Sequence, residues 1–514
     1  MTKKLTGLVL AASLIAATAM PAAAAEDGAK VLNAGATTGF FGAESLDVAY
    51  NWDGWIMSIY GISENLFRLD DNYVPQPYLA ESYEQIDDNT WEFMIRDGVM
   101  FSNGNPVTAE AVKGCFERTY ENNDRAASTL AIDSMEADGQ KLTIVTAQPD
   151  PTMLNDLCDP LLGIYDPTVE ADPELGVVCT GPYVATEFTA MTSVKMVKNE
   201  YYWQGEPKLD EVNLTIVDDM NTLTMALQNG EIDMIARLDA SAADLFTEDD
   251  AFTVAPATST RSTFVRFNME SEGINDFAVR QAIGYIIDRE SFADVVYNGY
   301  SEPCYGVFST AVPFGGTEGL ELTVDSYDPE KAAQILADAG YEDTNGDGTL
   351  DKDGVELAFT AITYSYNPET LQLADMMQAE LSNIGIGMNI ETYDVLDENL
   401  ANGDFDLTVE SYAMAPIGTP QYFTNMVFAT NGTDNFGKYS NEKVDEMAQT
   451  MSTTFDQEEQ YDLARQICQE ILNDRPLDFV GSTQLIFVYN NVVSGVEVNP
   501  SEYYMMTWDI DVDR

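Results

Sequence analysis

Residues Leu79–Tyr120 read LAESYEQIDDNTWEFMIRDGVMFSNGNPVTAEAVKGCFERTY. Near the end of this stretch a helix is predicted to begin at Thr108, because apolar residues then recur on one face: Val112, Cys115, Phe116 and Tyr120. Segments with strand and helix patterns alternate through the rest of the chain. This alternation predicts an α/β fold.

A second region of alternating helix and strand patterns lies over residues 328–390. A helix is predicted over Asp328–Gly340, with the aspartate as N-cap and Pro329 in the first helical position. A strand over Leu357–Thr363 is followed by a helix from Asn367 to Gly385 and by a strand over residues 386–390. Strand, helix and strand at this spacing predict a right-handed βαβ unit.

Composition limits the class of protein. The 514 residues suffice for two or more lobes, because a single core usually stops growing near 250 to 300 residues. The 87 acidic and 24 basic residues give a net charge of −63, which makes nucleic acid and anionic lipid poor partners. Histidine is absent, which excludes Ser–His–Asp and Cys–His catalysis and every metal centre that contains histidine.

The N-terminus resembles a secretory signal peptide. Lys3 and Lys4 precede an apolar run over residues 8–20, and Ala23–Ala25 provides a cleavage site of small residues. We expect cleavage after residue 25, which places the mature protein in the periplasm or outside the cell. A lipid anchor would require a cysteine at the cleavage site, but the first cysteine is Cys115, so the protein is expected to lack one.

The cysteines form no recognisable metal or redox motif. They stand at Cys115, Cys158, Cys179, Cys304 and Cys468, with no Cys-x-x-Cys pair among them. A thiolate zinc site and a thioredoxin-type centre are therefore not predicted. Because the number is odd, at least one cysteine is unpaired in a monomer, and the spacing favours a disulfide between Cys158 and Cys179.

The opening stretch resembles the hallmark of bacterial extracellular solute-binding protein family 5, which serves peptide and nickel ABC importers. Five further blocks are similar to motifs of the same family, in the same order: Thr180–Tyr183, Asn199–Asp210, Asn229–Asp233, Phe267–Arg289 and Asn402–Asn441. One such motif would be weak support for membership, but six in register are strong support.

The resemblance implies a type II periplasmic-binding-protein-like fold with two lobes, a crossover hinge and an extra small domain. Lobe one would comprise residues 26–65, 180–268 and 482–514, the small domain 66–179, and lobe two 269–481. Such a protein binds a solute between its lobes, closes, and presents it to an ABC permease in the membrane. The chain is expected to act as a monomer and to require no cofactor.

The resemblance leaves the solute open. A peptide or a similar small organic molecule is the main hypothesis. The alternative is a receptor for chelated nickel or a metallophore, because residues 99–104 resemble the nickel-binding branch; without histidine, the metal would have to arrive already chelated. A secreted hydrolase that uses two carboxylates is a more distant alternative, since no catalytic spacing stands out.

Several residues are candidates for ligand contact. Peptide-binding members of the family carry an Asp-Pro pair whose aspartate holds the peptide amino terminus, whereas this chain has Thr419-Pro420. Aromatic and apolar side chains would line the site instead. The candidates are Phe40, Tyr50, Trp52, Trp55, Tyr412, Met414, Thr419 and Tyr422. Ordinary core packing is the alternative for each of them.

Arg266 is unusual in a predicted buried strand, because a buried guanidinium requires an acidic partner. A ligand carboxylate as that partner would make Arg266 an anchor for the solute. A protein carboxylate would make it structural, and the abundance of acidic residues favours this second interpretation.

One loop resembles a calcium site. Oxygen-bearing residues alternate at Asp343, Asn345, Asp347, Thr349 and Asp351, which fits the first nine positions of a calcium-binding loop. The twelfth position is Gly354 instead of the usual glutamate. A structural calcium ion and a turn held by its own Asx hydrogen bonds are the two hypotheses.

Overall fold

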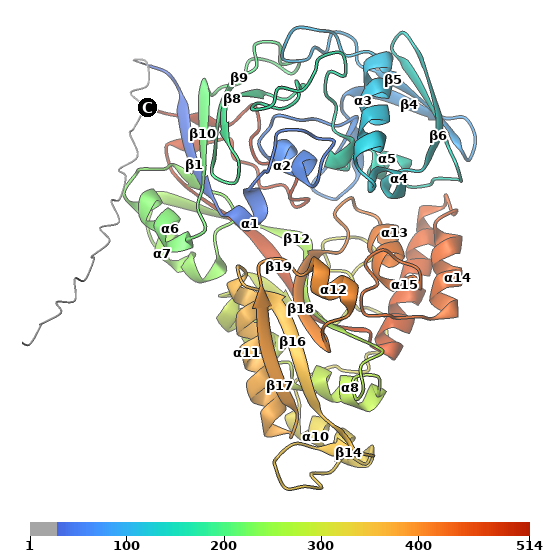
Figure 1. The fold of residues 1–514 in the computed structure, drawn as a ribbon. Coiled ribbons are helices and arrows are strands. Elements are labelled where there is room, and N and C mark those ends of the chain that lie inside the picture. Colours follow the sequence, from blue (N-terminus) through green and yellow to red (C-terminus); the bar gives the residue numbers. More distant parts are fainter. Residues whose placement is uncertain (1–27) are drawn as a thin grey trace, which may run out of the picture.

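The computed structural model describes residues 28–514 (Figure 1). The expected signal peptide, residues 1–25, lies outside the described residues. Among the described helices, none has both the length and the apolar character that crossing a membrane requires. The molecule has an upper half, formed by residues 28–251 and 491–514, and a lower half, formed by residues 268–476.

One large sheet of eleven strands extends through both halves. In spatial order its strands are β17 (Gly387–Tyr393), β16 (Ala358–Tyr364), β18 (Leu407–Ala413), β12 (Phe252–Phe267), β19 (Leu477–Asn490), β11 (Met234–Ile235), β1 (Val31–Ala36), β10 (Glu211–Ile216), β9 (Ser193–Lys198) and β8 (Tyr183–Thr189). The short strand β13 (Ser301–Pro303) also pairs with β19. Strands from distant parts of the chain therefore lie next to one another.

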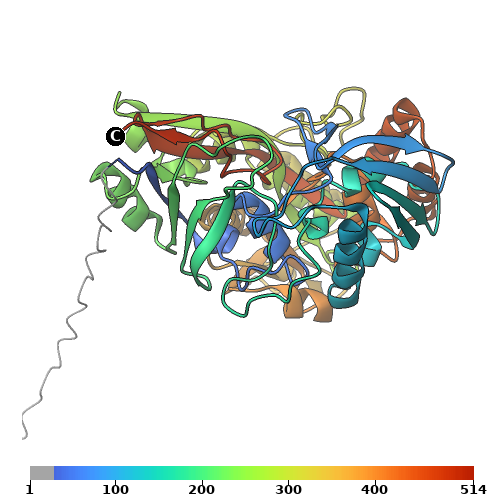
Figure 2. The same ribbon diagram turned by 90° about the horizontal axis from the view of Figure 1, so that it is seen from above.

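Strands β12 and β19 cross between the two halves, as Figures 1 and 2 show. They are 16 and 14 residues long and pair in antiparallel fashion. In the lower half β12 also pairs with β18, and in the upper half β19 also pairs with β11. Their register shifts between Thr258 and Ser262, at the level where the two halves meet. A bulge of this kind bends a strand locally and suits a connection between lobes.

The lower half contains the predicted βαβ elements. Strands β16 and β17 are parallel, and α11 (Pro368–Asn383) connects them. The Asn367 side chain accepts a hydrogen bond from the backbone N–H of Thr370, which starts this helix as predicted. Helix α10 (Pro329–Asp338) is likewise capped by Asp328. The other longer helices of this half are α8 (Phe277–Ile286), α14 (Glu442–Met451) and α15 (Gln457–Asp474).

The upper half carries a separate antiparallel sheet in the order β4 (Ala80–Gln85), β5 (Thr90–Ile95), β7 (Lys141–Thr146) and β6 (Ile132–Asp138). Helix α3 (Ala109–Asn122) lies against it. Thr108 caps this helix and Val112, Cys115 and Phe116 are buried, as predicted, whereas Tyr120 is half-buried. This sheet falls inside the range assigned to the small domain, whose limits stay a prediction.

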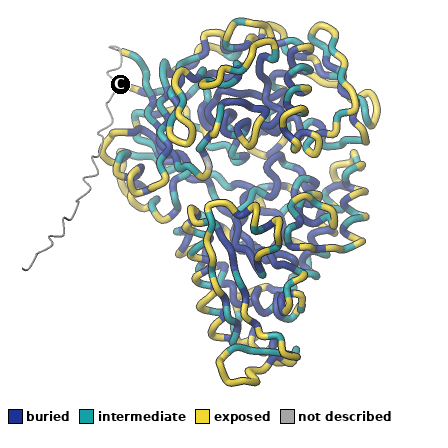
Figure 3. The backbone as a smooth tube through the Cα atoms, viewed as in Figure 1, coloured by how far each residue is buried: buried dark blue, intermediate teal, exposed yellow. Residues whose placement is uncertain are grey.

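The remaining helices of the upper half that matter for the site are short. They are α1 (Thr38–Phe41), α2 (Asp53–Ile59), α6 (Met220–Gln228) and α7 (Asp244–Thr247). Figure 3 shows buried backbone in the interior of both halves and exposed backbone mainly in the outer loops. Apolar side chains thus stabilise each half from within.

The predicted Cys158–Cys179 disulfide is wrong. All five cysteines are free and buried. The Cys158 thiol donates to the Leu154 carbonyl at 3.3 Å, and the Cys179 thiol contacts the Val177 carbonyl at 3.8 Å. Proximity in sequence does not determine which side chains meet in the fold, and here each thiol packs as a small apolar group.

Candidate ligand-binding junction

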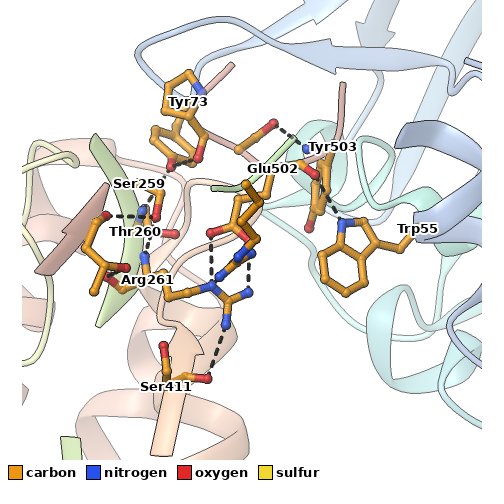
Figure 4. Close-up of polar contacts among 12 residues, drawn as sticks. Trp55, Tyr73, Ser259, Thr260, Arg261, Ser411, Glu502 and Tyr503 are labelled. Atoms are coloured by element: carbon orange, nitrogen blue, oxygen red, sulfur yellow. Dashed lines mark hydrogen bonds and ion pairs between the residues drawn. The ribbon is translucent and has the colours of Figure 1, made fainter. Parts of the chain in front are cut away.

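Two arginines share one carboxylate where the upper and lower halves meet (Figure 4). Arg261 contacts Glu502 through Nε, 3.0 Å from Oε1, and through Nη2, 2.9 Å from Oε2. Arg237 Nη1 lies 3.0 Å from the same Oε2. Glu502 is buried, so both guanidinium groups are held in a region of low solvent access.

Local backbone conformation places these charges. Arg237 follows β11 with φ of 57°, and Glu502 has φ of 67° in the C-terminal segment. Residues other than glycine rarely adopt this left-handed region, and such positions concentrate at functional sites. The indole N–H of Trp55, in α2, donates to the Glu502 carbonyl at 3.2 Å and fixes that segment.

Arg261 also connects the halves. Its Nη1 donates to the backbone carbonyl of Ser411 in β18, at 3.1 Å. Just before it in β12, the Thr260 backbone N–H donates to the Tyr73 hydroxyl at 3.1 Å. That hydroxyl donates in turn to the Pro500 carbonyl, at 2.6 Å. The guanidinium therefore touches both halves next to the bulge in β12.

The junction also perturbs two carboxyl groups in opposite directions. Burial opposes ionisation of Glu502, but Arg261 and Arg237 outweigh it and lower its pKa to about 2. Burial raises the pKa of Glu369 to about 7, and the charge of Asp239 adds to this effect while Arg237 opposes it. Glu369 lies in the first turn of α11 and Asp239 follows β11, so the two halves bring these acidic groups together.

A pocket adjoins the carboxylate on the upper side. Its cavity volume is only about 20 Å³, and it is lined by Phe41, Trp55, Ile59, Arg237, Leu485, Phe487, Asn499, Glu502, Tyr504 and Met505. Most of these side chains are apolar, with the charged pair at one side. Apolar walls with a few polar groups are typical of small-molecule sites.

The predicted aromatic residues after the first strand separate in the fold. Trp55 reaches the junction through Glu502. Tyr50 and Trp52 are exposed and face α3 and the turn after it: the Tyr50 hydroxyl donates to Asn122 at 3.0 Å, and the Arg125 guanidinium lies 3.3 Å from the Trp52 ring centroid. Phe40 belongs to α1, and its side chain lies outside the described part of the structure.

The predicted residues of the lower half also divide into two groups. Met414 is fully buried, and Thr419 is buried at the N-cap of the short helix α13 (Pro420–Phe423), so both pack inside the fold. Tyr412 and Tyr422 are half-buried and interact through their hydroxyls. Tyr412 lies opposite Ser262, one position after Arg261, in the pairing of β18 with β12.

Arg266 finds its acidic partner within the protein. Its Nε and Nη2 lie 2.9 Å and 3.3 Å from the two carboxylate oxygens of Glu410, and Nη1 donates to the Asp434 carbonyl at 2.8 Å. Both charged side chains are almost completely buried. This arrangement supports the structural interpretation of Arg266 over the ligand anchor.

The candidate calcium loop is a turn held by its own hydrogen bonds. Asp343 accepts from the backbone N–H of Gly346 at 2.6 Å and of Gly348 at 3.0 Å. Asn345 accepts from the N–H of Asp347 and Asp347 from that of Thr349, while Asp351 accepts from Thr344. Within residues 28–514 no group of three or more acidic or cysteine side chains is arranged to hold a metal ion. These hydrogen bonds support the Asx-turn hypothesis, and calcium binding stays the alternative hypothesis.

Sequence reasoning missed the centre of the junction. Arg237, Arg261 and Glu502 are far apart in the chain: Glu502 comes 241 positions after Arg261 and 265 positions after Arg237. Two isolated arginines in a chain that has only 24 basic residues were the available signal. Arg261 in particular lies in a small polar run, Ser259–Thr263, inside a strand.

The family model described as bacterial extracellular solute-binding proteins, family 5 Middle, matches residues 74–435. The chain belongs to this family. The predicted membership, the α/β periplasmic-binding-protein fold and the general role in solute capture are thereby confirmed.

Curated relatives of this family 5 protein have different named ligands. The nickel-binding protein NikA of Staphylococcus aureus is 28% identical over 455 residues, which cover 88% of this chain and 90% of that protein. The oligopeptide-binding protein AppA of Bacillus subtilis is 25% identical over 81% and 79% of the two chains. The glutathione-binding protein GsiB of Escherichia coli is 27% identical over 76% and 77%.

Solved structures agree with the fold of this family 5 protein. NikA of Staphylococcus aureus in complex with Ni(L-His)2 superposes with a TM-score of 0.82 at 26% identity, over 94% of this chain and all of that one. AppA of Bacillus subtilis with a nonapeptide has a TM-score of 0.81 at 22% identity, over 95% and 100%. The family thus combines one architecture with several classes of solute.

Proposed function

We propose that this chain is the extracytoplasmic substrate-binding component of an ABC importer and that it captures a peptide or a similar small organic solute. The observation that carries the proposal is the arginine pair at the junction of the two halves. Arg237 and Arg261 together carry two positive charges against the one carboxylate of Glu502, and this excess of positive charge would attract a carboxylate of the solute. Arg261 contacts both halves, so a solute held there can influence their relative position.

Neighbouring residues would complete the site. Glu502 orients both guanidinium groups, while Trp55, Tyr412 and Tyr422 offer aromatic faces for the body of the solute. A solute that touches both halves favours the closed arrangement of the protein, to the extent that it binds the closed arrangement more tightly than the open one. Binding by this means makes and breaks no covalent bond, so we assign the chain no enzymatic activity.

We also propose where the protein acts and with which partner. An N-terminal signal peptide would export the chain to the periplasm or the outside of the cell, where it would act as a monomer without a lipid anchor. The partner would be an ABC permease in the membrane. No cofactor is required.

A nickel chelate is the second candidate for the solute. It is favoured by the likeness to NikA of Staphylococcus aureus, which was crystallised in complex with Ni(L-His)2. Because this chain contains no histidine, the chelator would supply the nitrogen ligands. The carboxylates of the chelator would then meet the same arginines.

Thermal-shift assays on the purified mature protein test the proposal. A pool of di- and tripeptides and nickel with a twofold excess of L-histidine serve as separate probes. We expect one of them to raise the melting temperature, because a ligand that binds only the folded state stabilises it by mass action. Native mass spectrometry should then recover the bound molecule unchanged. Turnover of that molecule would contradict the proposal.

The variant Arg261→Gln tests whether the solute binds at the arginine pair. The variant should weaken binding of the positive probe by at least about tenfold, because one of the two positive charges at the junction is lost. Arg465→Gln, at an exposed arginine of α15, is the matched control and should leave binding unchanged. Melting temperatures without probe separate a loss of binding from a loss of fold.

A further inference from the structure

Tyr366 of the lower half lies against Gly39 of the upper half. Tyr366 stands between β16 and α11, and Gly39 is in α1. A Cβ atom placed on Gly39 would lie 2.9 Å from both Cδ2 and Cε2 of the Tyr366 ring. Real Cβ atoms almost never come so close to a neighbouring atom, so glycine at this position permits the contact.

The contact is not part of a continuous core. Gly39 is exposed, and Tyr366 is 46% exposed. The Tyr366 ring has a tilted contact with Tyr364, 5.2 Å between centroids. The contact between the Tyr366 ring and the backbone of Gly39 therefore exists only when the upper and lower halves are close together.

Backbone conformation does not explain the glycine. Gly39 is absent from the positions with positive φ, so an L-residue could adopt its backbone angles. Glycine inside a helix costs about 0.5 to 1 kcal/mol relative to alanine, and a steric reason would account for its presence here. The Tyr366 ring supplies that reason.

The positive charge of the arginine pair acts on Tyr366. Burial raises the pKa of its hydroxyl, while the positive charges of Arg261 and Arg237 oppose that rise. Tyr366 therefore belongs to the electrostatic surroundings of Arg237 and Arg261. Its neighbour Asn367 caps α11, which anchors this end of the loop.

We propose that Tyr366 is a positioning residue for closure: its ring seats on the backbone of Gly39 when the halves meet and stabilises the arrangement in which a solute is held at Arg237 and Arg261. The inference rests on the proposed function and adds to it a residue pair that secures the closed state. A ring seated in this way slows escape of the solute, so its loss acts mainly on the dissociation rate.

Gly39→Leu, Tyr366→Ala and the double variant test the proposal. The probe is whichever of the peptide pool or nickel with L-histidine raises the melting temperature of the wild-type protein more. Each single variant should weaken binding of that probe by about tenfold, through faster dissociation. In the double variant Gly39→Leu should add almost nothing, because the ring with which leucine collides is gone. Fully additive losses, or no loss in Gly39→Leu, would overturn the proposal.

The control is Gly387→Ala in β17, where a Cβ atom would meet only ordinary contacts of 3.6 Å and beyond. It should bind the probe as the wild type does. Melting temperatures without probe should be equal in Gly39→Leu and in the wild type, because the collision is between halves and not within one of them.

A cross-linking experiment separates this proposal from the proposed function. In Gly39→Cys/Tyr366→Cys, mild oxidation should join the two positions, and the five native cysteines are buried. Cross-linking that the positive probe accelerates supports the closing role. If positions 39 and 366 cross-link although neither probe binds, the contact between the halves is supported, but a peptide and a nickel chelate are contradicted as solutes. Absence of cross-linking with a probe bound overturns the closing role.

Discussion

Glu502 combines three tasks at the scale of single residues. Its carboxylate holds Arg237 and Arg261, and its carbonyl accepts from Trp55. A buried charge is tolerated when opposite charges and hydrogen bonds compensate for its loss of water, and the two arginines provide both. The same two arginines would be left facing each other without it.

Glu502→Gln should therefore destabilise the protein by about 3 to 5 kcal/mol, because removing one partner leaves buried charge uncompensated. Urea unfolding followed by circular dichroism measures the change. Glu200→Gln, at an exposed glutamate, should have almost no effect. A loss below about 1 kcal/mol in Glu502→Gln would show that the cluster contributes little to stability.

Glu369 should make stability depend on pH. Its pKa in the folded protein is about 7, against 4.5 for an ordinary glutamate. Between these values the folded state holds a proton that the unfolded state has released, so stability is fully present below pH 4.5 and falls as pH rises through 7.

Glu369→Gln should remove this contribution, at most about 3 kcal/mol between pH 4.5 and pH 7.5. The measurement is the free energy of unfolding of both proteins at these two pH values, with Glu446→Gln, an exposed glutamate, as the control. Parallel pH profiles for the wild type and Glu369→Gln would mean that the Glu369 carboxyl titrates normally.

At the scale of elements, sequence signals that act over short distances are sufficient to predict individual helices and strands. Thr108, Asp328 and Asn367 each cap the helix that follows, because an N-cap bonds to a backbone N–H only three residues away. The alternating and helical patterns likewise located β16, α11 and β17. Family motifs added the two-lobed fold, which local patterns alone do not specify.

The candidate site could be predicted only in part, because it depends on contacts across the whole chain. Trp55 lies at the junction, but Tyr50 and Trp52 turn toward α3, although all three are neighbours in sequence. No local pattern shows that Glu502 meets Arg261. Such pairs are determined by how the strands of the large sheet are ordered, and a single sequence does not state that order.

The loop over Asp343–Asp351 should keep its shape without a metal ion. Its oxygen atoms already accept from its own N–H groups, and Gly354 offers no carboxylate at the twelfth position. We therefore expect added calcium at about 1 mM, the weak end of natural sites, to shift the melting temperature by less than about 1 °C.

A clear rise with calcium that a chelator reverses would instead establish the calcium site. Asp347→Ala, which removes one of the oxygen ligands, should then abolish that rise.

At the scale of the whole molecule, charge is the dominant property. A net charge of −63 on one chain causes repulsion among surface carboxylates, which destabilises a compact state. The buried ion pairs at the junction are screened little by salt, whereas the exposed acidic residues are screened strongly.

The melting temperature should accordingly rise with ionic strength, by roughly 5 °C between about 0.05 M and 1 M sodium chloride. Differential scanning calorimetry measures the rise. Choline chloride should produce a similar effect, because screening does not depend on the cation. A melting temperature that falls with salt would show that attractive surface pairs outweigh repulsion.

The crossing strands have a consequence for how the chain acquires its structure during synthesis. Strand β1 and the crossing strand β19 both pair with β11, and Lys30 forms an ion pair with Asp511, near the opposite end of the chain. The upper half therefore cannot be completed until the segment that contains β19 and Asp511 has been synthesised. Until then the upper half lacks strands with which its own strands pair, so its folding depends on contacts between segments that are distant in the sequence.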